Sequence, residues 1–199
     1  MNNKTLILSL SALAIAINVI AGTVVGNLKI PFLFLDALGT FFIAASFGPY
    51  WGASVGVVTN FVLGVTSGYT EIPFAIVNGV IGLVVGFLAT KRGYTLRTAI
   101  LSGIIVGLVA PIIGTLIAVV VFGGLTGGGQ DAFVLFFKQT GASLFTSAFI
   151  PRLIDNIIDK NISAILIYYV IKSIPASLLG KSGKISEKIA PAGEENING

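Results

Sequence analysis

Long apolar runs alternate along the chain with short breaks that contain glycine, proline or charged residues. An α-helix needs about 20 apolar residues to cross the hydrocarbon core of a bilayer. Six runs approach that length, at residues 5–26, 32–47, 50–67, 72–90, 96–122 and 150–174. The pattern predicts an all-α membrane protein whose residues 1–175 form a six-transmembrane-helix bundle. Residues 176–199 are polar and are expected to form a disordered tail.

Two segments can be interpreted in more than one way. The first run follows Lys4 and contains Ala-x-Ala triplets, as a secretory signal peptide does, but it continues to Val25 without a polar break. We therefore expect a retained first helix. Residues 131–149 contain an apolar stretch of only five residues, 133–137, with Lys138 directly after it. That stretch is too short to span, so we expect an external helix or loop over the bundle mouth rather than a seventh crossing.

Basic residues predict the orientation of the bundle. With six crossings, Lys4, the loop containing Lys91, Arg92 and Arg97, and the C-terminal lysines all fall on one side. Basic residues collect on the cytoplasmic side, so the N- and C-termini are both expected in the cytoplasm. A seventh crossing would place the lysine-rich tail outside, which the same rule disfavours.

Composition removes several classes of function. Hydrophobic residues make up 55% of the chain and charged residues 10%, whereas about a quarter of a soluble domain is charged. Cysteine and histidine are absent, which excludes thiol nucleophiles and the common zinc sites, and we expect no metal and no cofactor. The glycine-rich residues 123–129 lack the Lys-Ser/Thr ending of a phosphate-binding loop, so the chain is not an ATPase. Basic clusters between apolar runs are typical of membrane topology rather than of nucleic-acid binding.

Small residues recur at every fourth position in several runs. Such rows let helix backbones approach closely in lipid, so we expect most of them to pack inside the bundle. They include Gly52, Gly56, Asn60, Gly64 and Gly68, then Gly82 with Gly86, and Gly103 with Gly107. Ala12 and Ala16 have the same spacing in the first run. Spacing alone favours internal packing for this pair, and a docking face for another membrane subunit is the alternative.

Charges are rare in the apolar runs, and the last run holds most of them. Its outer half holds four charged residues and two asparagines: Arg152, Asp155, Asn156, Asp159, Lys160 and Asn161. Helical spacing places Arg152, Asp155 and Asp159 on one face. Either these residues neutralise one another, Arg152 with Asp155 and Asp159 with Lys160 or Lys138, or they line a ligand pocket. The sequence alone leaves both possibilities open.

Aromatic residues accompany these charges near the outer ends of the runs. They are Phe32, Phe34, Tyr69, Phe74 and Phe133. Apolar walls with a few polar groups suit a small heterocycle, although an aromatic belt at the membrane interface is the alternative. We predict that Glu71, Asp159, Lys160 and Asn161 lie near one outward cavity, closed by the 27–31 loop and by the segment around Phe133.

The sequence resembles the substrate-binding S components of energy-coupling factor (ECF) vitamin transporters. The matching stretches are residues 11–18, 35–40, 47–53 and 72–79, with Asp159, Lys160 and Ser163 ahead of Pro175. The resemblance implies tight binding of a small vitamin or related heterocycle at the outer side of a prokaryotic cell (plasma) membrane. It also implies a membrane T subunit and two cytoplasmic ATPase subunits as partners, with no catalysis on this chain.

The resemblance further implies where the partners bind. Ala12 and Ala16 would dock on the T subunit. The substrate site would be built from ten residues: Lys29, Tyr69, Glu71, Asn78, Lys138, Asp155, Asn156, Asp159, Lys160 and Asn161. The acidic residues would favour a cationic or hydrogen-bond-donating heterocycle, whereas Lys138, Arg152 and Lys160 would equally favour a carboxylate. A membrane-embedded sensor or structural partner without transport, and a small membrane enzyme using two aspartates, are the alternatives.

Overall fold

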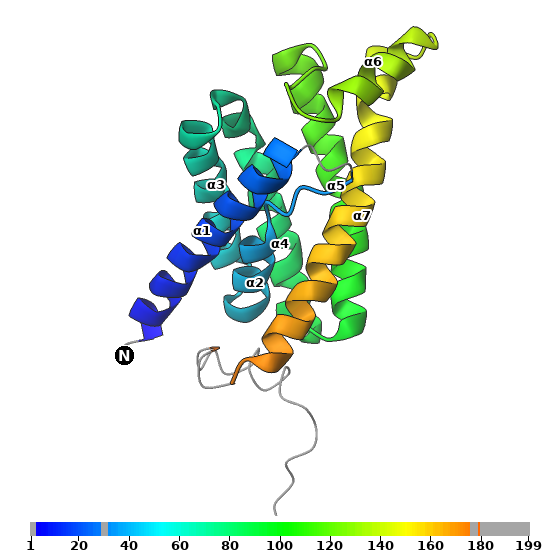
Figure 1. Ribbon diagram of the computed structural model, residues 1–199. Coiled ribbons are helices and arrows are strands. Elements are labelled where there is room, and N and C mark those ends of the chain that lie inside the picture. The colour runs from blue at the N-terminus through cyan, green and yellow to red at the C-terminus, as the bar shows by residue number, and fades with distance from the viewer. Residues whose placement is uncertain (1–2, 29–31, 176–178, 180–199) are drawn as a thin grey trace, which may run out of the picture.

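The computed structural model describes residues 3–28, 32–175 and 179. These residues form helices and connecting loops, with no strand among them. The helices are α1 (Asn3–Leu28), α2 (Leu38–Phe47), α3 (Pro49–Thr66), the 3-10 helix η1 (Tyr69–Phe74), α4 (Ala75–Arg92), α5 (Leu96–Phe122), α6 (Asp131–Gln139) and α7 (Leu144–Ser173). Figure 1 shows α5 and α7 running side by side, with α1 crossing the bundle obliquely and α6 lying at one end.

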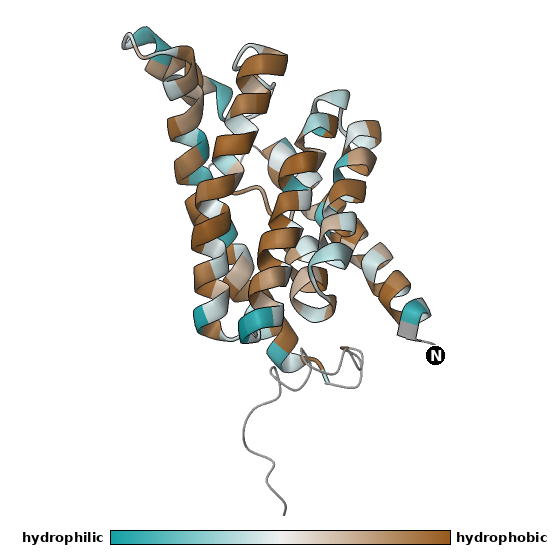
Figure 2. Ribbon diagram, turned by 180° about the vertical axis from the view of Figure 1, so that it is seen from behind, coloured by the Kyte–Doolittle hydropathy of each residue, from teal (hydrophilic) through white to brown (hydrophobic). Residues whose placement is uncertain are grey.

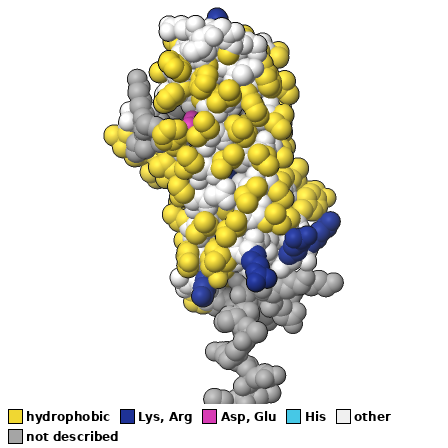
Figure 3. Space-filling model, turned by 90° about the vertical axis from the view of Figure 1, so that its right-hand side faces the viewer, with side chains coloured by type: hydrophobic (Ala, Val, Ile, Leu, Met, Phe, Trp, Pro, Cys, Tyr) yellow, Lys and Arg dark blue, Asp and Glu magenta, His cyan; other side chains and the backbone are white. Residues whose placement is uncertain are grey.

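Three of the described helices are long and apolar enough to cross a membrane. They cover Lys4–Leu28, Tyr69–Arg92 and Leu96–Phe122. On α5 the exposed large side chains recur at every fourth position, at Ile100, Ile104, Leu108, Ile112 and Leu116. Hydrophobic residues cover the outward helix faces in Figure 2 and the flank of the molecule in Figure 3. Such an exposed apolar surface is far larger than a soluble protein shows, and it fits a lipid environment.

Basic residues collect at one end of the bundle. Lys91 and Arg92 lie in the last turn of α4, and Lys172 lies in the last turn of α7. Arg97 follows at the start of α5. Figure 1 shows that the N-terminal end of α1 lies at this same end, and Figure 3 shows Lys and Arg side chains gathered there.

The predicted second helix begins too early. Residues 32–47 were expected to be one helix, but α2 begins at Leu38 and has 10 residues. Phe32 and Leu35 have positive φ angles of 65° and 53°, which a helix does not allow. The backbone N–H groups of Phe34 and Leu35 donate to the Asp159 side chain instead. A distant carboxylate therefore replaces the hydrogen bonds that a helix would have supplied here.

The last helix begins earlier than the expected residue 150. Ser143 caps α7, because its hydroxyl oxygen accepts a hydrogen bond of 3.1 Å from Thr146 N–H. The first turns of α7 thus take up residues 144–149 of the ambiguous segment. The remainder contains α6, whose nine residues extend about 13 Å and fall well short of a bilayer crossing.

The glycine rows pack helix against helix, as the spacing predicted. A Cβ atom on Gly82 would lie 2.3 Å from the backbone nitrogen of Ala53, and one on Gly86 would lie 2.3 Å from the Cα atom of Pro49. On the facing helix, a Cβ atom on Gly56 would lie 2.3 Å from the carbonyl oxygen of Asn78. The backbones of α3 and α4 can meet this closely only because no side chain intervenes.

A buried network of amide and hydroxyl groups links five elements, and we call it the amide network. Asn18 of α1 donates to Thr40 and Thr59, both at 3.0 Å. Thr40 donates to Asn78 of α4 at 2.9 Å. Asn78 donates to Asn60 of α3 at 2.9 Å, and Asn60 donates to the Glu71 carbonyl oxygen of η1 at 3.1 Å. Buried polar groups need such partners, so the network fixes how these elements meet.

Candidate ligand-binding site

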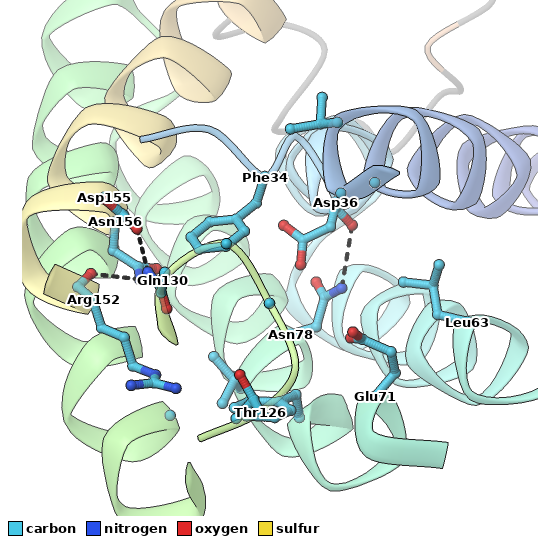
Figure 4. Close-up of a pocket in the computed structure, with 18 of the residues that line it drawn as sticks. Phe34, Asp36, Leu63, Glu71, Asn78, Thr126, Gln130, Arg152, Asp155 and Asn156 are labelled. Atoms are coloured by element: carbon cyan, nitrogen blue, oxygen red, sulfur yellow. Dashed lines mark hydrogen bonds between the residues drawn. The ribbon is translucent and has the colours of Figure 1, made fainter. Parts of the chain in front are cut away.

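A cavity of about 380 Å³ opens at the end of the bundle away from the basic cluster. Its volume lies in the range typical of small-molecule sites. The C-terminal end of α1, the loop before α2, η1, the 126–130 segment and four helices (α3, α4, α5 and α7) contribute to its walls. Figure 4 shows labelled side chains from opposite walls converging on this space.

Asp159 lies behind the cavity wall rather than in it. Its side chain is fully buried. One carboxylate oxygen accepts hydrogen bonds of 2.9 Å from the backbone N–H groups of Phe34 and Leu35. The other accepts from Lys160 Nζ at 2.6 Å. Asp159 therefore anchors the loop before α2 to α7, and that loop forms part of the cavity wall.

Lys160 lines the cavity, but its charge is already matched. Its Nζ atom lies 3.0 Å from Asp36 Oδ1 and 2.6 Å from Asp159 Oδ2. The same atom lies 5.7 Å from the centroid of the Phe34 ring. The predicted pairing of Asp159 with Lys160 is confirmed. Asp36, whose side chain is 30% exposed at the cavity, is the second partner.

The predicted pairing of Arg152 with Asp155 is wrong for this structure. Arg152 Nη1 donates to the Ala148 carbonyl oxygen at 2.9 Å, one turn earlier on the same helix. Asp155 accepts a hydrogen bond from the Gln130 side chain. Asn156 donates to the Arg152 carbonyl oxygen at 2.8 Å. Helical spacing allowed the pair, but the 126–130 segment supplies Asp155 with a closer partner.

Glu71 lies in η1 and brings a carboxylate to the cavity wall opposite α7. Its carbonyl oxygen belongs to the amide network. Within the described residues its carboxylate makes neither a hydrogen bond nor an ion pair. Figure 4 shows Glu71 near Asp36 and Asn78, across the cavity from Arg152.

Half of the ten sequence-predicted site residues line the cavity. They are Glu71, Asn78, Asp155, Asn156 and Lys160. Four others do not. Tyr69 is 81% exposed and Lys138 is also exposed, whereas Asp159 is buried as described above. Asn161 donates to the Ile157 carbonyl oxygen and lies against α5 at Gly103. Lys29 lies outside the described residues.

The cavity is also lined by residues outside the ten predicted ones. Phe34 and Phe74 were expected as possible apolar walls, and Arg152 was left open between pairing and lining a pocket. Asp36, Asn60 and Gln130 were not placed at the cavity. The charge of Asp36 within an apolar run was a usable signal, and so was the single asparagine in the glycine row of α3. Phe32, also in the wall, lies 6.3 Å from the Phe133 ring, so the α6 segment approaches the cavity rim as expected.

Ala12 and Ala16 face away from the bundle. Both are exposed, whereas Ser11, Ala14 and Asn18 on the other side of α1 are buried. Their spacing alone favoured internal packing, and that interpretation is wrong because α1 packs through its opposite face. The exposed face of α1 is therefore available to a partner in the membrane.

Comparison with known proteins gives one positive result. A sequence model of the family described as "ECF transporter, substrate-specific component" matches residues 6–171. The match covers every helix that contributes to the cavity. No curated protein and no solved structure gives a significant match.

Proposed function

This chain belongs to the family of substrate-specific components of ECF transporters, and we propose its function on that basis. Such components serve transporters and are not enzymes. The proposed function is capture of a small water-soluble vitamin or related heterocycle and its translocation into the cell. A separate T subunit and two ATPase subunits would supply the energy, and this chain would act as the S component of the importer.

The observation that carries this proposal is the cavity of about 380 Å³, which has aromatic walls and two charged residues, Glu71 and Arg152, that form no ion pair among the described residues. Phe34 and Phe74 offer apolar ring faces, and Glu71 and Arg152 offer groups that hydrogen-bond strongly. An enzyme using two aspartates is disfavoured, because Asp159 is buried outside the cavity lining. The wall residues suit binding without chemical conversion.

We propose the same orientation that the basic residues indicate. Six passes would cross a prokaryotic cell membrane, with both termini in the cytoplasm: α1, the 32–47 segment, α3, α4, α5 and α7. Because α2 alone has 10 residues and extends about 15 Å, the loop before it would complete the second pass. The cavity would then open outward. Residues 1–175 would form the membrane domain, and residues 176–199 a cytoplasmic tail. The collection of Lys91, Arg92 and Lys172 at one end of the bundle supports this orientation.

Single-cysteine labelling is expected to report this orientation. The chain contains no cysteine, so Thr95→Cys and Gln139→Cys each introduce one thiol. In intact cells an impermeant maleimide should label Gln139→Cys, which lies at the cavity end, and should leave Thr95→Cys unlabelled until the cells are opened. Ready labelling of both variants in intact cells would contradict six crossings with cytoplasmic termini.

The exposed alanine face gives the test of the transport function itself. Ala12→Trp or Ala16→Trp is expected to reduce uptake to background, because a large ring prevents close approach of a partner helix. Ligand retention by the purified variant should stay within about twofold of wild type, since neither residue lines the cavity. Uptake into cells that express the complete transporter, and co-purification of the T subunit, are the measurements.

Ile104→Trp is the matched control, because Ile104 is exposed on α5 instead of α1. It should leave both uptake and complex formation near wild type. Loss of ligand retention in Ala12→Trp, with a normal complex, would contradict the proposed docking face.

A further inference from the structure

We infer that the cavity selects a small amphoteric molecule, with an acidic group held by Arg152 and an N–H donor held by Glu71. This inference rests on the proposed function and specifies the chemistry of its substrate. The sequence left a cationic and an anionic ligand equally open. The structure narrows the choice because it shows which charged side chains of the cavity already form ion pairs within the protein.

The basic residues near the cavity are not equivalent. Lys160 is paired with both Asp36 and Asp159, so its charge is offset before any ligand arrives. Lys138 is exposed on α6 and does not belong to the cavity wall. Among the described residues that line the cavity, Arg152 is therefore the base that forms no ion pair, although Asp131 and Asp155 lie close enough for their charges to act on it.

Arg152 is 5% exposed, yet its hydrogen bonding is incomplete. A guanidinium group has five N–H donors, and the described residues accept only from Nη1, through the Ala148 carbonyl oxygen. The nearby acids are engaged elsewhere. Asp131 accepts from the backbone N–H groups of Thr126 and Gly127, and Asp155 accepts from Gln130. A carboxylate or phosphate on the ligand would supply the missing acceptors in the bidentate geometry that arginine favours.

The opposite wall has the complementary requirement. The Glu71 carboxylate has no hydrogen-bond or ion-pair partner among the described residues. Arg152 and Glu71 belong to different walls and form no ion pair with each other. An N–H donor or ammonium group on the ligand would satisfy Glu71 while the acidic group satisfies Arg152.

Aromatic rings lie in the same cavity. Figure 4 shows the Phe34 ring between the Arg152 wall and the Glu71 wall. Phe74 also lines the cavity and is stacked on Phe122 with ring centroids 6.2 Å apart, which fixes its orientation. A planar ring in the ligand can pack against these faces while its two polar ends reach opposite walls. The inferred ligand is therefore a ring compound with an acid at one end and a nitrogen donor at the other.

Retention of small molecules from deproteinised yeast extract tests this inference. Purified protein is incubated with the extract and washed, and the retained small molecules are identified by mass spectrometry. Wild type is expected to retain a ring compound with a carboxylate or phosphate and an N–H group, and its mass distinguishes the two acids. Arg152→Gln should reduce retention by about 10- to 150-fold, the range for a lost charged hydrogen bond. Arg152→Lys should restore part of it.

Arg97→Gln is the matched control, since it removes the same charge from an exposed site at the other end of the bundle. It should retain the compound as wild type does. The amide or methyl ester of the retained compound should also bind wild type at least about 10-fold more weakly, and this comparison needs no variant to fold.

Two results would overturn the inference in different ways. Retention of a neutral or purely cationic compound, equal in wild type and Arg152→Gln, would refute the acidic anchor but leave the proposed function intact. Retention of nothing by wild type would refute the proposed function, and the inference would fall with it.

Discussion

Asp159→Ala is expected to destabilise the protein by about 3–5 kcal/mol, the usual cost of removing one partner from a buried ion pair. The substitution leaves Lys160 buried with only Asp36, which is partly exposed. It also leaves the backbone N–H groups of Phe34 and Leu35 without their acceptor. Thermal unfolding in detergent, followed by size exclusion, measures the loss.

Asp155→Ala is the matched control, one turn earlier on α7. The Asp155 carboxylate accepts from a single side chain, that of Gln130, and has no ion-pair partner among the described residues. Its removal should cost only about 1 kcal/mol. The loss of stability in Asp159→Asn should lie between those of Asp159→Ala and Asp155→Ala, because an amide oxygen can still accept hydrogen bonds from the Phe34 and Leu35 N–H groups. A stability of Asp159→Ala equal to that of wild type would contradict the anchoring role of Asp159.

Gly82→Ala is expected to give the second large effect, through the contact between α3 and α4. The added Cβ atom would lie 2.3 Å from Ala53 N and 2.3 Å from the carbonyl carbon of Gly52. These are backbone atoms, so the helices must separate. Overpacking of about 3 kcal/mol or more outweighs the gain of about 1 kcal/mol in helix propensity.

Gly114→Ala is the control for this prediction. It lies inside α5, and an added Cβ atom would meet Phe74 at 3.7 Å, an ordinary van der Waals contact. This substitution should be neutral or slightly stabilising in the same unfolding measurement. A folded, monodisperse Gly82→Ala protein of wild-type stability would contradict the close packing of α3 on α4.

Sequence reasoning located the helices best where local signals mark both ends. The fifth apolar run, 96–122, coincides with α5, because Thr95 caps its start and Gly123 adopts the left-handed conformation at its end. The predicted start of the second helix was wrong because the segment before α2 is held by hydrogen bonds to a distant residue. Phe34 and Leu35 donate to Asp159, which is 125 and 124 positions away. No local pattern contains that information.

The candidate site was predictable as a region but not as a set of contacts. Helical spacing correctly grouped the charges of α7, yet it could not show that the loop before α2 would be their neighbour. The pairing of Asp36 with Lys160, 124 residues apart, therefore distinguishes two bases that the sequence left equivalent. Lys160 is held in ion pairs, whereas Arg152, which was not among the ten predicted site residues, keeps N–H donors without a partner among the described residues.

The attachment of the α2 loop to Asp159 also constrains the order of biogenesis. A ribosome adding about 5–20 residues per second reaches Asp159 roughly 6–25 s after Phe34. During that interval the loop has been synthesised, but its acceptor has not. Helices α1 to α5 can pack through their glycine rows without it, yet the cavity wall is completed only when α7 arrives. The proposed ligand binding would therefore require the finished chain, and a nascent chain arrested before α7 would lack a closed site.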